Sequence, residues 1–519
     1  MIQIRNLSVA LRKDLRVVIE DFSLVLNDGD KAVIIGEEGN GKSTLLKAIY
    51  DAKAIAGYAD VEGEILTFGA KIGFLRQELN DADKRAGVGA YCAAIDGFWD
   101  LPPGELTKIA RALRLDSGLF FSEQTVGTLS GGERVKLQIA RLLIEKPGLY
   151  LLDEPSNDID LETLAWLEKF IRNSLIPVLF VSHDETLIEN TANMVLHIEL
   201  VRRKTHPRIT VARLTYRDYI ERRASGLARQ TQRARNEKDE YDTKMDRFRQ
   251  IQQQVHHDQA SVSRQDPHGG QLLKKKMRAV KSMERRFDKE HESMTRLPDV
   301  EDAIFLKFGP GSVMPNGKTV LDFALDKLEH DGVLLARNIH LRVTGAEKVC
   351  IIGRNGAGKT SLLRLIAAQL LTRKDIRAAY MPQNYEEMLD FAKTPVEFLA
   401  PSGQKADVTK AMTYLGSVKY TADEMSHTID ELSGGQKGKL FLLKMILDGA
   451  DVLILDEPTR NFSPLSNPVL RGVLKDFGGA VISVSHDRKF IAEVCSAVYT
   501  LTETGLELDK NQNAAAKSL

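Results

Sequence analysis

Short, nearly continuous apolar runs recur along this chain, and each of them ends at glycine or at polar residues. Residues 31–35 and 348–352 lead into glycine-rich turns that a helical pattern follows, whereas residues 149–152 and 452–455 end in Asp-Glu. Runs without polar alternation are typical of strands that are buried on both faces of a parallel sheet. The pattern predicts an α/β fold with its functional groups at the carboxyl ends of the strands.

The pattern changes between about Tyr216 and Arg296, where charged residues are dense and apolar residues are sparse. The apolar residues that remain follow a heptad spacing in two stripes: Tyr241, Met245, Phe248 and Val255, and then Leu273, Met277, Val280, Phe287 and Met294. This spacing predicts two long helices that fold back at residues 258–271 into an antiparallel hairpin. With a rise of about 1.5 Å per residue, the helices would be roughly 60 Å and roughly 40 Å long.

The chain contains one ordered series of four motifs twice. A Gly-x4-Gly-Lys-Ser/Thr loop, a Leu-Ser-Gly-Gly segment, an Asp-Glu-Pro segment and a Ser-His-Asp segment follow one another in both copies. Repetition in the same order indicates a duplicated domain. We therefore predict a first α/β domain at residues 1–215, a helical hairpin linker at 216–300, a second α/β domain at 301–510 and a disordered tail at 511–519.

Composition excludes several classes of protein. Hydrophobic residues make up 43% of the 519 residues and charged residues 28%, and 72 basic residues balance 72 acidic ones, which is ordinary for a globular protein. No apolar run approaches the roughly 20 residues that span a bilayer, and the chain starts on a strand pattern, so we expect neither membrane insertion nor a signal peptide. Cys92, Cys350 and Cys495 are scattered, which favours a reducing cytoplasmic compartment over a disulfide framework or a metal site.

The two glycine-rich loops carry the most specific chemistry. A Gly-x4-Gly-Lys-Ser/Thr loop wraps backbone N–H groups around phosphates at a helix N-terminus; its lysine reaches the β- and γ-phosphates and its hydroxyl holds Mg²⁺. Lys42, Ser43, Lys359 and Thr360 are assigned these roles. The other residues expected to contact the nucleotide are Gly36, Gly39, Asn40, Gly41 and Thr44 in the first copy, and Gly353, Gly356, Ala357, Gly358 and Ser361 in the second.

The Asp-Glu pairs follow predicted buried strands. Asp153 and Asp456 are placed to hold the shell of a Mg²⁺ ion, and Glu154 and Glu457 to orient and deprotonate an attacking water. A single Asp-Glu pair would more often be a solvated strand end. Its recurrence at the same spacing after each Leu-Ser-Gly-Gly segment favours the functional interpretation.

Three further pairs gain meaning only from this order. Ser130 and Ser433 could be simple helix caps, Gln77 and Gln383 surface glutamines, and His183 and His486 structural histidines. Taken with the loops and the acid pairs, the ordered set resembles the ATP-binding-cassette superfamily over about 400 of the 519 residues.

This resemblance implies that two cassettes pair head to tail, with each ATP between the phosphate loop of one cassette and the Leu-Ser-Gly-Gly signature of the other. In each site the glutamine would sense the metal and the water, and the histidine would sense the γ-phosphate. Mg²⁺ would be held by Ser43, Gln77 and Asp153 in one site and by Thr360, Gln383 and Asp456 in the other. One site would combine Lys42, Ser43, Gln77, Asp153, Glu154 and His183 with Ser433, Gly434 and Gly435. The other would combine Lys359, Thr360, Gln383, Asp456, Glu457 and His486 with Ser130, Gly131 and Gly132.

Two complete cassettes joined by a charged helical linker resemble the ABC-F subfamily. The resemblance implies a cytoplasmic ATPase, monomeric with an intramolecular cassette pair, that binds the ribosome near the tRNA exit site. The hairpin would approach ribosomal RNA, the P-site tRNA and the peptidyl-transferase centre. Some members of the subfamily are translation factors, and others dislodge antibiotics from the ribosome.

Three departures from the family pattern modify these expectations. The second copy has Thr459-Arg-Asn-Phe-Ser463 where the family has Thr-Asn-His-Leu-Asp, while the first copy keeps Asp160. The resemblance implies that the loop with Ser463 lies against the Lys42 phosphate loop, and the loop with Asp160 against that of Lys359. Because a serine cannot offer a fixed carboxylate, the Lys42 site should be the weaker hydrolytic one, unless Asn461 or a water substitutes. Leu11 stands where a tyrosine is common, so the preference for ATP over GTP rests on the family alone. The first cassette leaves no room for the arm of a translational throttle, which favours a ribosome-protection factor.

Two other classes use related cassettes. A subunit of a membrane transporter would leave the basic hairpin unexplained, and a DNA-associated ATPase would need a much longer coiled coil between half-cassettes. Asp266, Glu284 and Asp288 are the acids between Arg264 and Lys289, against nine basic residues, so this segment carries a net charge of about +6. Such a segment is either a solvated strut or a phosphate-binding surface. The basic residues are Arg264, Lys274, Lys275, Lys276, Arg278, Lys281, Arg285, Arg286 and Lys289.

Overall fold

The computed structural model describes residues 1–13, 15–157, 159–201, 205–261, 267–295, 297–298, 314–330 and 332–509. The chain forms two compact units: Met1–Tyr216 together with Glu301–Leu519, and Arg217–Val300. The first unit contains both copies of the motif series. The tail predicted at residues 511–519 lies outside the described residues.

Each copy is built on a six-stranded sheet with the same topology. The strand orders are β5-β6-β7-β3-β8-β9 and β13-β14-β15-β12-β16-β17. The first five strands of each order run parallel, and the edge pairs β8–β9 and β16–β17 are antiparallel. The first sheet consists of β3 (Lys31–Ile35), β5 (Ile72–Leu75), β6 (Leu149–Asp153), β7 (Val178–Val181), β8 (Met194–Leu200) and β9 (His206–Ala212). The second consists of β12 (Lys348–Gly353), β13 (Ala378–Met381), β14 (Val452–Asp456), β15 (Ala480–Val484), β16 (Ala497–Thr502) and β17 (Gly505–Leu508).

The central strands explain the apolar runs of the sequence. Every residue of β6 and of β14 is buried, because helices cover both faces of a parallel sheet. The α/β fold predicted from these runs is thereby confirmed. The final residues of the two strands, Asp153 and Asp456, are themselves buried at the carboxyl edge.

Smaller antiparallel sheets accompany the two main sheets. In the first copy β1 (Ile2–Leu11) lies between β2 (Val17–Leu26) and β4 (Ala59–Leu66). In the second copy β10 (Thr319–His330) pairs with β11 (Val333–Thr344). Their apolar faces belong to the same cores as the parallel strands and the helices that follow the glycine-rich loops.

Matching helices follow the matching motifs, and two of them begin with a capping box. Ser130 and Glu133 form the box of one helix, and Ser433 and Gln436 that of its counterpart. The matching pairs are α1 (Lys42–Tyr50) and α12 (Lys359–Leu371), α6 (Gly131–Glu145) and α16 (Gly434–Leu447), α7 (Leu161–Asn173) and α17 (Asn467–Lys475), and α8 (Glu185–Thr191) and α18 (Arg488–Val494). The described residues also form α2 (Ala52–Ile55), α3 (Asp81–Arg85), α4 (Val88–Ala93), α5 (Pro103–Leu113), α13 (Pro395–Leu399), α14 (Lys405–Ser417) and α15 (Ala422–Ser426), and 3₁₀ turns at Ser117–Phe121, Val126–Thr128, Tyr385–Glu387 and Ile429–Glu431.

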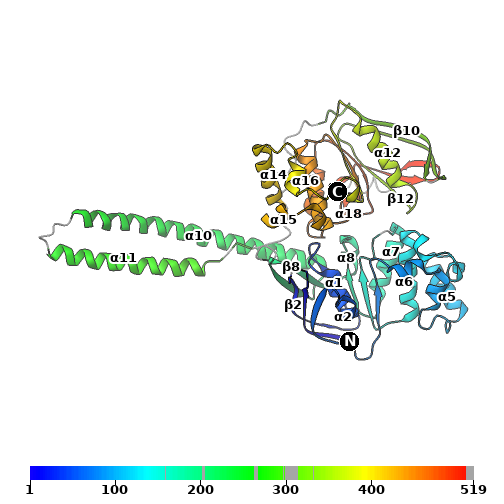
Figure 1. Ribbon diagram of the computed structural model, residues 1–519, viewed down its shortest axis with the longest axis horizontal. Coiled ribbons are helices and arrows are strands. Elements are labelled where there is room, and N and C mark those ends of the chain that lie inside the picture. Colours follow the sequence, from blue (N-terminus) through cyan, green and yellow to red (C-terminus); the bar gives the residue numbers. More distant parts are fainter. Residues whose placement is uncertain are drawn as a thin grey trace. The chain divides into compact units, whose positions relative to one another are not determined.

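The second unit is a helical hairpin. Figure 1 shows α10 (Tyr216–Ser261) and α11 (Pro267–Ser293) running side by side. Aromatic contacts join them: the ring centroid of Phe287 lies 5.3 Å from that of Phe248 and 6.3 Å from that of Tyr241. The helices extend further than the predicted turn at residues 258–271 allows, because α10 continues to Ser261 and α11 begins at Pro267. Residues 262–266, which include Arg264, lie outside the described residues.

One predicted position of the apolar seam is wrong. Met277 is 42% exposed, whereas Phe248 is only 5% exposed. Two helices without a third neighbour cover one narrow stripe of each other, so a heptad position that drifts from this stripe stays in solvent.

The aromatic contacts generate a test of the hairpin. We expect Phe248→Ala to destabilise the helical unit by about 3 kcal/mol, the lower end of the range for a buried phenylalanine. Ile251→Ala is the matched control, since Ile251 lies on the same helix but is 45% exposed. Hydrogen exchange of α10 and α11 measures the effect, and equal exchange rates in the two variants would contradict the packing described here.

Candidate functional site

Both glycine-rich loops curl around their own lysine. Lys42 Nζ donates to the carbonyl oxygens of Gly36 and Glu37 at 2.8 and 2.9 Å, and Lys359 makes the matching bonds in the second loop. Gly41 precedes α1 with a φ of 84°, a left-handed conformation that favours glycine. The loops therefore hold a lysine ammonium and the first N–H groups of a helix at one place, an arrangement suited to an anion.

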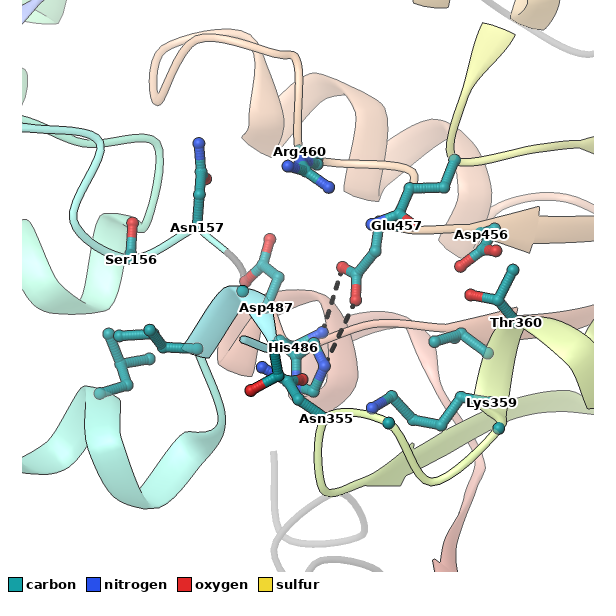
Figure 2. Close-up of a pocket in the computed structure, with 18 of the residues that line it drawn as sticks. Ser156, Asn157, Asn355, Lys359, Thr360, Asp456, Glu457, Arg460, His486 and Asp487 are labelled. Atoms are coloured by element: carbon teal, nitrogen blue, oxygen red, sulfur yellow. Dashed lines mark hydrogen bonds and ion pairs between the residues drawn. The ribbon is translucent and has the colours of Figure 1, made fainter. Parts of the chain in front are cut away.

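An aspartate at the end of a strand faces each loop hydroxyl. Ser43 Oγ donates to Asp153 Oδ1 at 2.9 Å, and burial raises the pKa of Asp153 to about 6 although this bond opposes the shift. Asp456 lies beside Thr360 (Figure 2), and within the described part of the chain neither of its buried carboxylate oxygens has a hydrogen-bond partner. A buried acid with unused oxygens next to a hydroxyl fits a Mg²⁺ ion, which takes few protein ligands when a phosphate supplies the others.

The glutamates that follow these aspartates have unusual backbone conformations. Glu154 and Glu457 both have a φ of 50°, which costs about 1–3 kcal/mol for a residue other than glycine. Backbone bonds to the adjacent strands hold them there, from Glu154 N to the Val181 carbonyl at 3.1 Å and from Glu457 N to the Val484 carbonyl at 2.9 Å. Strain retained at the same position of both copies marks these residues as functional candidates.

The two glutamates differ in their partners. His183 Nε2 forms an ion pair with Glu154 at 3.0 Å, and the other ring nitrogen donates to the Phe462 carbonyl of the second copy at 2.6 Å. Burial opposes the charge of Glu154, but His183 outweighs it and lowers the Glu154 pKa. His486 Nε2 lies 3.7 Å from Glu457, where burial and then the Asp456 charge raise the Glu457 pKa to about 8.

A cavity of about 740 Å³ opens at the Lys359 loop and is lined by both copies. Figure 2 shows Lys359, Thr360 and Asp456 on one side, Ser156 and Asn157 of the first copy on the other, and dashed lines between Glu457 and His486. The volume is typical of a small-molecule site. The structure brings together here the predicted residues Ser130, Gly131, Gly356, Gly358, Lys359, Thr360, Ser361, Gln383, Asp456, Glu457 and His486. His183, which the sequence assigned to the other site, also lines this cavity. Gly132 lines a neighbouring pocket with Asp160 and Arg354.

Acidic side chains span the same interface at the Lys42 loop. The carboxylate of Glu38 accepts a hydrogen bond from the backbone N–H of Gly435, in the signature of the second copy. The neighbouring Glu37 forms an ion pair with Lys439 at 2.9 Å and accepts hydrogen bonds of 2.6 Å from Ser463 and Ser466. The sequence motifs did not identify either glutamate as a site residue, although two acids inside a loop expected to bind an anion are unusual.

Other predicted residues lie further from the shared surfaces. Asn40 is buried, and its side-chain amide donates to the Ile198 carbonyl at 3.2 Å, so it supports the loop from behind. Gln77 is exposed just beyond β5, and the parallel pairing of Leu75 with Leu152 sets it at the same edge as Asp153.

The turn between β10 and β11 also reaches the Lys359 cavity. His330, Val333 and Leu335 line it, and a Cβ added at Gly358 would lie 2.8 Å from Leu335 Cδ1. This turn matches the region of Leu11 in the first copy, where the sequence offers no aromatic ring that could stack on a base. His330 could have been found from the sequence only by aligning this turn of the second copy with the region of Leu11.

The sequence model of the ABC transporter family matches residues 19–157 and 336–460, just over half of the chain. The chain belongs to this family. The energy-dependent translational throttle protein EttA of Escherichia coli is 25% identical over 94% of this chain and 90% of its own length. ABC transporter F family member 5 of Arabidopsis thaliana is 26% identical over 77% of this chain and 56% of its own length.

A solved structure supports the same fold. The archaeal ribosome recycling factor, crystallised with a ribosomal stalk protein, superposes with a TM-score of 0.60 at 17% identity, covering 98% of this chain and 91% of that one. The tandem-cassette ABC-F assignment made from the sequence is confirmed, and the two copies are ABC ATPase cassettes. No helix within the described ranges has the length and apolar character that crossing a membrane requires.

The cavity generates a test of nucleotide recognition in this ABC ATPase. We expect His330→Ala to weaken ATP binding about tenfold, because an aromatic ring stacked on a base contributes about 1–3 kcal/mol. Tripolyphosphate, which has no base, should bind the variant as it binds the unmodified protein. His340→Ala is the matched control, since His340 is an exposed histidine on β11 that does not line the cavity. Equal ATP affinity in both variants, measured by calorimetry, would exclude His330 as a base contact.

Proposed function

We propose that this protein is an ABC-F ATPase that hydrolyses ATP between its cassettes and acts on the ribosome. One observation carries the enzymatic part: a single cavity contains the Lys359 loop, the Asp456-Glu457 pair and the signature Ser130 of the other cassette. A triphosphate in this cavity would touch a lysine, a helix N-terminus and a buried acid pair simultaneously.

Each residue of the Lys359 site has a defined task in this proposal. Lys359 and the N-terminus of α12 bind the phosphates, and Thr360, Asp456 and Gln383 hold Mg²⁺, which neutralises charge on the β- and γ-phosphates when it is bound. Glu457 orients the attacking water and takes its proton. His486 and the signature Ser130, which both line the cavity, would contact the γ-phosphate. The Lys42 side contains the matching residues, which are Ser43, Gln77, Asp153, Glu154, His183 and the signature Ser433.

The partners of the two glutamates support unequal activity. His183 Nε2 lies 3.0 Å from Glu154 and its ring is also bonded to the second cassette, whereas His486 Nε2 lies 3.7 Å from Glu457 at the open cavity. Releasing Glu154 for work on a water requires breaking this ion pair. The Lys359 site should therefore carry most of the turnover, in line with the sequence expectation for Ser463.

Glutamine substitutions provide the kinetic test. We expect Glu457→Gln to slow ATP turnover by a factor of about 10²–10⁴, the usual loss on removal of a general base, while ATP still binds. Glu154→Gln should reduce turnover less, and the double variant should hold ATP with the cassettes closed. The turnover of all three variants is measured as phosphate release under saturating ATP. Near-normal turnover of the double variant, or a larger loss with Glu154→Gln, would contradict the assignment.

The basic surface of the hairpin supports the ribosomal part. Lys274, Lys275 and Lys276 follow one another on α11 and are exposed. Exposed basic side chains bind RNA backbone phosphates without reading the sequence. Because the relative EttA is named a translational throttle protein, this chain is proposed to act on translation as well. Its proposed partners are ribosomal RNA and the P-site tRNA, reached from near the tRNA exit site.

Ribosome protection from antibiotics fits this chain better than throttling. Residues 77–130 form short helices, of which the longest is α5 with 11 residues. An arm that reaches across the ribosome would need a much longer helical pair in this segment.

Charge reversal on the hairpin tests the ribosomal partner. Replacing Lys274, Lys275 and Lys276 by glutamate should abolish cosedimentation of the ATP-trapped double variant with ribosomes, because phosphate contacts turn into repulsion. ATP binding should be unchanged. The matched control replaces three exposed lysines of the cassettes, Lys53, Lys405 and Lys410, by glutamate. Ribosome binding that survives the hairpin change at physiological salt, or that does not weaken as salt rises, would show that the hairpin is only a strut.

A further inference from the structure

The two phosphate loops differ in charge at matching positions. Glu37 and Glu38 occupy the places that Arg354 and Asn355 occupy in the second loop. In a loop that binds a triphosphate, a positive residue at this place strengthens binding and a negative residue weakens it, while a neutral residue has no such effect. Two consecutive acids at this place therefore require a structural explanation.

Glu37 supplies the carboxylate for a contact between the cassettes at which the opposite cassette has Ser463. Its Oε1 accepts hydrogen bonds from both Ser463 and Ser466, and its Oε2 pairs with Lys439. Ser463 stands where the first cassette has Asp160, so the carboxylate of this contact comes from the phosphate loop instead of from the loop facing it. Neither Asn461 nor a water is needed for this role.

The environment of Glu37 shows that its charge is well compensated. Burial alone would raise its pKa, but Lys439 and the two serine hydroxyls lower the pKa to about 2. The side chain of Lys439 is itself only 8% exposed. Both partners are shielded from water, and Glu37 accepts two further hydrogen bonds. Loss of either partner would therefore leave a buried charge, which costs more than breaking a surface ion pair.

Glu38 occupies the N-terminus of the signature helix α16. Its carboxylate accepts the N–H of Gly435, and a Cβ added at Gly434 would lie 3.0 Å from its Oε1. A helix N-terminus stabilises a negative charge through its exposed N–H groups and its dipole. The γ-phosphate of a nucleotide on Lys42 is expected against this same helix end, so the carboxylate and the phosphate compete for one place.

We propose that Glu37 and Glu38 form a built-in anionic clamp that closes the Lys42 site without a γ-phosphate. The clamp excludes tight binding of a nucleoside triphosphate at this site while the cassettes are closed there. ATP binding and exchange are then confined to the Lys359 site, and the Lys42 side only holds the two cassettes together. The proposal rests on the assignment of two nucleotide sites made above, but it is independent of the ribosome.

The first experiment counts bound ATP. In the Glu457→Gln protein, which holds ATP without hydrolysing it, equilibrium dialysis should find one tightly bound ATP per chain. Adding Glu37→Gln and Glu38→Gln removes two charges while preserving shape, and it should strengthen a second ATP site at least about tenfold. Glu62→Gln, an exposed acid of the same cassette, should leave the count at one. Two ATP sites of equal affinity with both glutamates intact would overturn the proposal.

The second experiment needs no nucleotide. Without ATP, the Gly435 N–H should exchange about 10- to 100-fold faster in Glu37→Ala/Glu38→Ala than in the unmodified protein, since a bond to a charged acceptor is lost. The first turn of α6, which faces Asn355, is the internal control and should not change. Unaltered exchange at Gly435 would also overturn the clamp. If no ATP binds even at Lys359, the assignment of the nucleotide sites fails, and this exchange measurement alone decides on the clamp.

Discussion

A buried ion pair between the cassettes fixes the surfaces on which both sites depend. Arg471 contacts Glu185 through two nitrogens, at 2.6 and 3.3 Å, and the side chains are only 4% and 5% exposed. Arg471 also pairs with Glu493 of its own cassette at 2.8 Å, and Glu185 with Lys489 of the second cassette at 3.2 Å. Both basic partners of the buried Glu185 therefore come from the second cassette, and docking in this orientation neutralises its charge.

The neighbouring contacts share one polarity: the acids come from the first cassette and the bases from the second. Arg488 pairs with Glu168 at 3.0 Å, and Lys489 with Glu189 at 2.6 Å. The Glu37–Lys439 pair belongs to the same series. A chain whose total charge is zero thus divides its charges by sign across an internal surface, which disfavours pairing of either cassette with a copy of itself.

This polarity also accounts for the difference between the two nucleotide sites. Acids of the first cassette fill the space around its own phosphate loop, whereas the loop of the second cassette carries Arg354 and faces an open cavity. The same catalytic pattern of loop, acid pair and histidine is therefore present twice in different electrostatic settings. The Lys359 half therefore presents an open cavity, whereas the acids of the Lys42 half are bonded to the opposite cassette.

The sequence by itself determined the α/β class, the duplication, the helical hairpin and the motifs from which the candidate site residues were chosen. These properties are local: buried strands leave continuous apolar runs, and a phosphate loop needs its glycines and lysine within eight positions of the chain. What only the tertiary structure decided are contacts between residues about 400 positions apart, such as Glu38 with Gly435 and Glu37 with Lys439. Nothing in the spacing of a motif states which acid of one cassette faces which base of the other. That depends on how two folded surfaces dock, and docking is set by the sum of their packing and charge and not by any short segment.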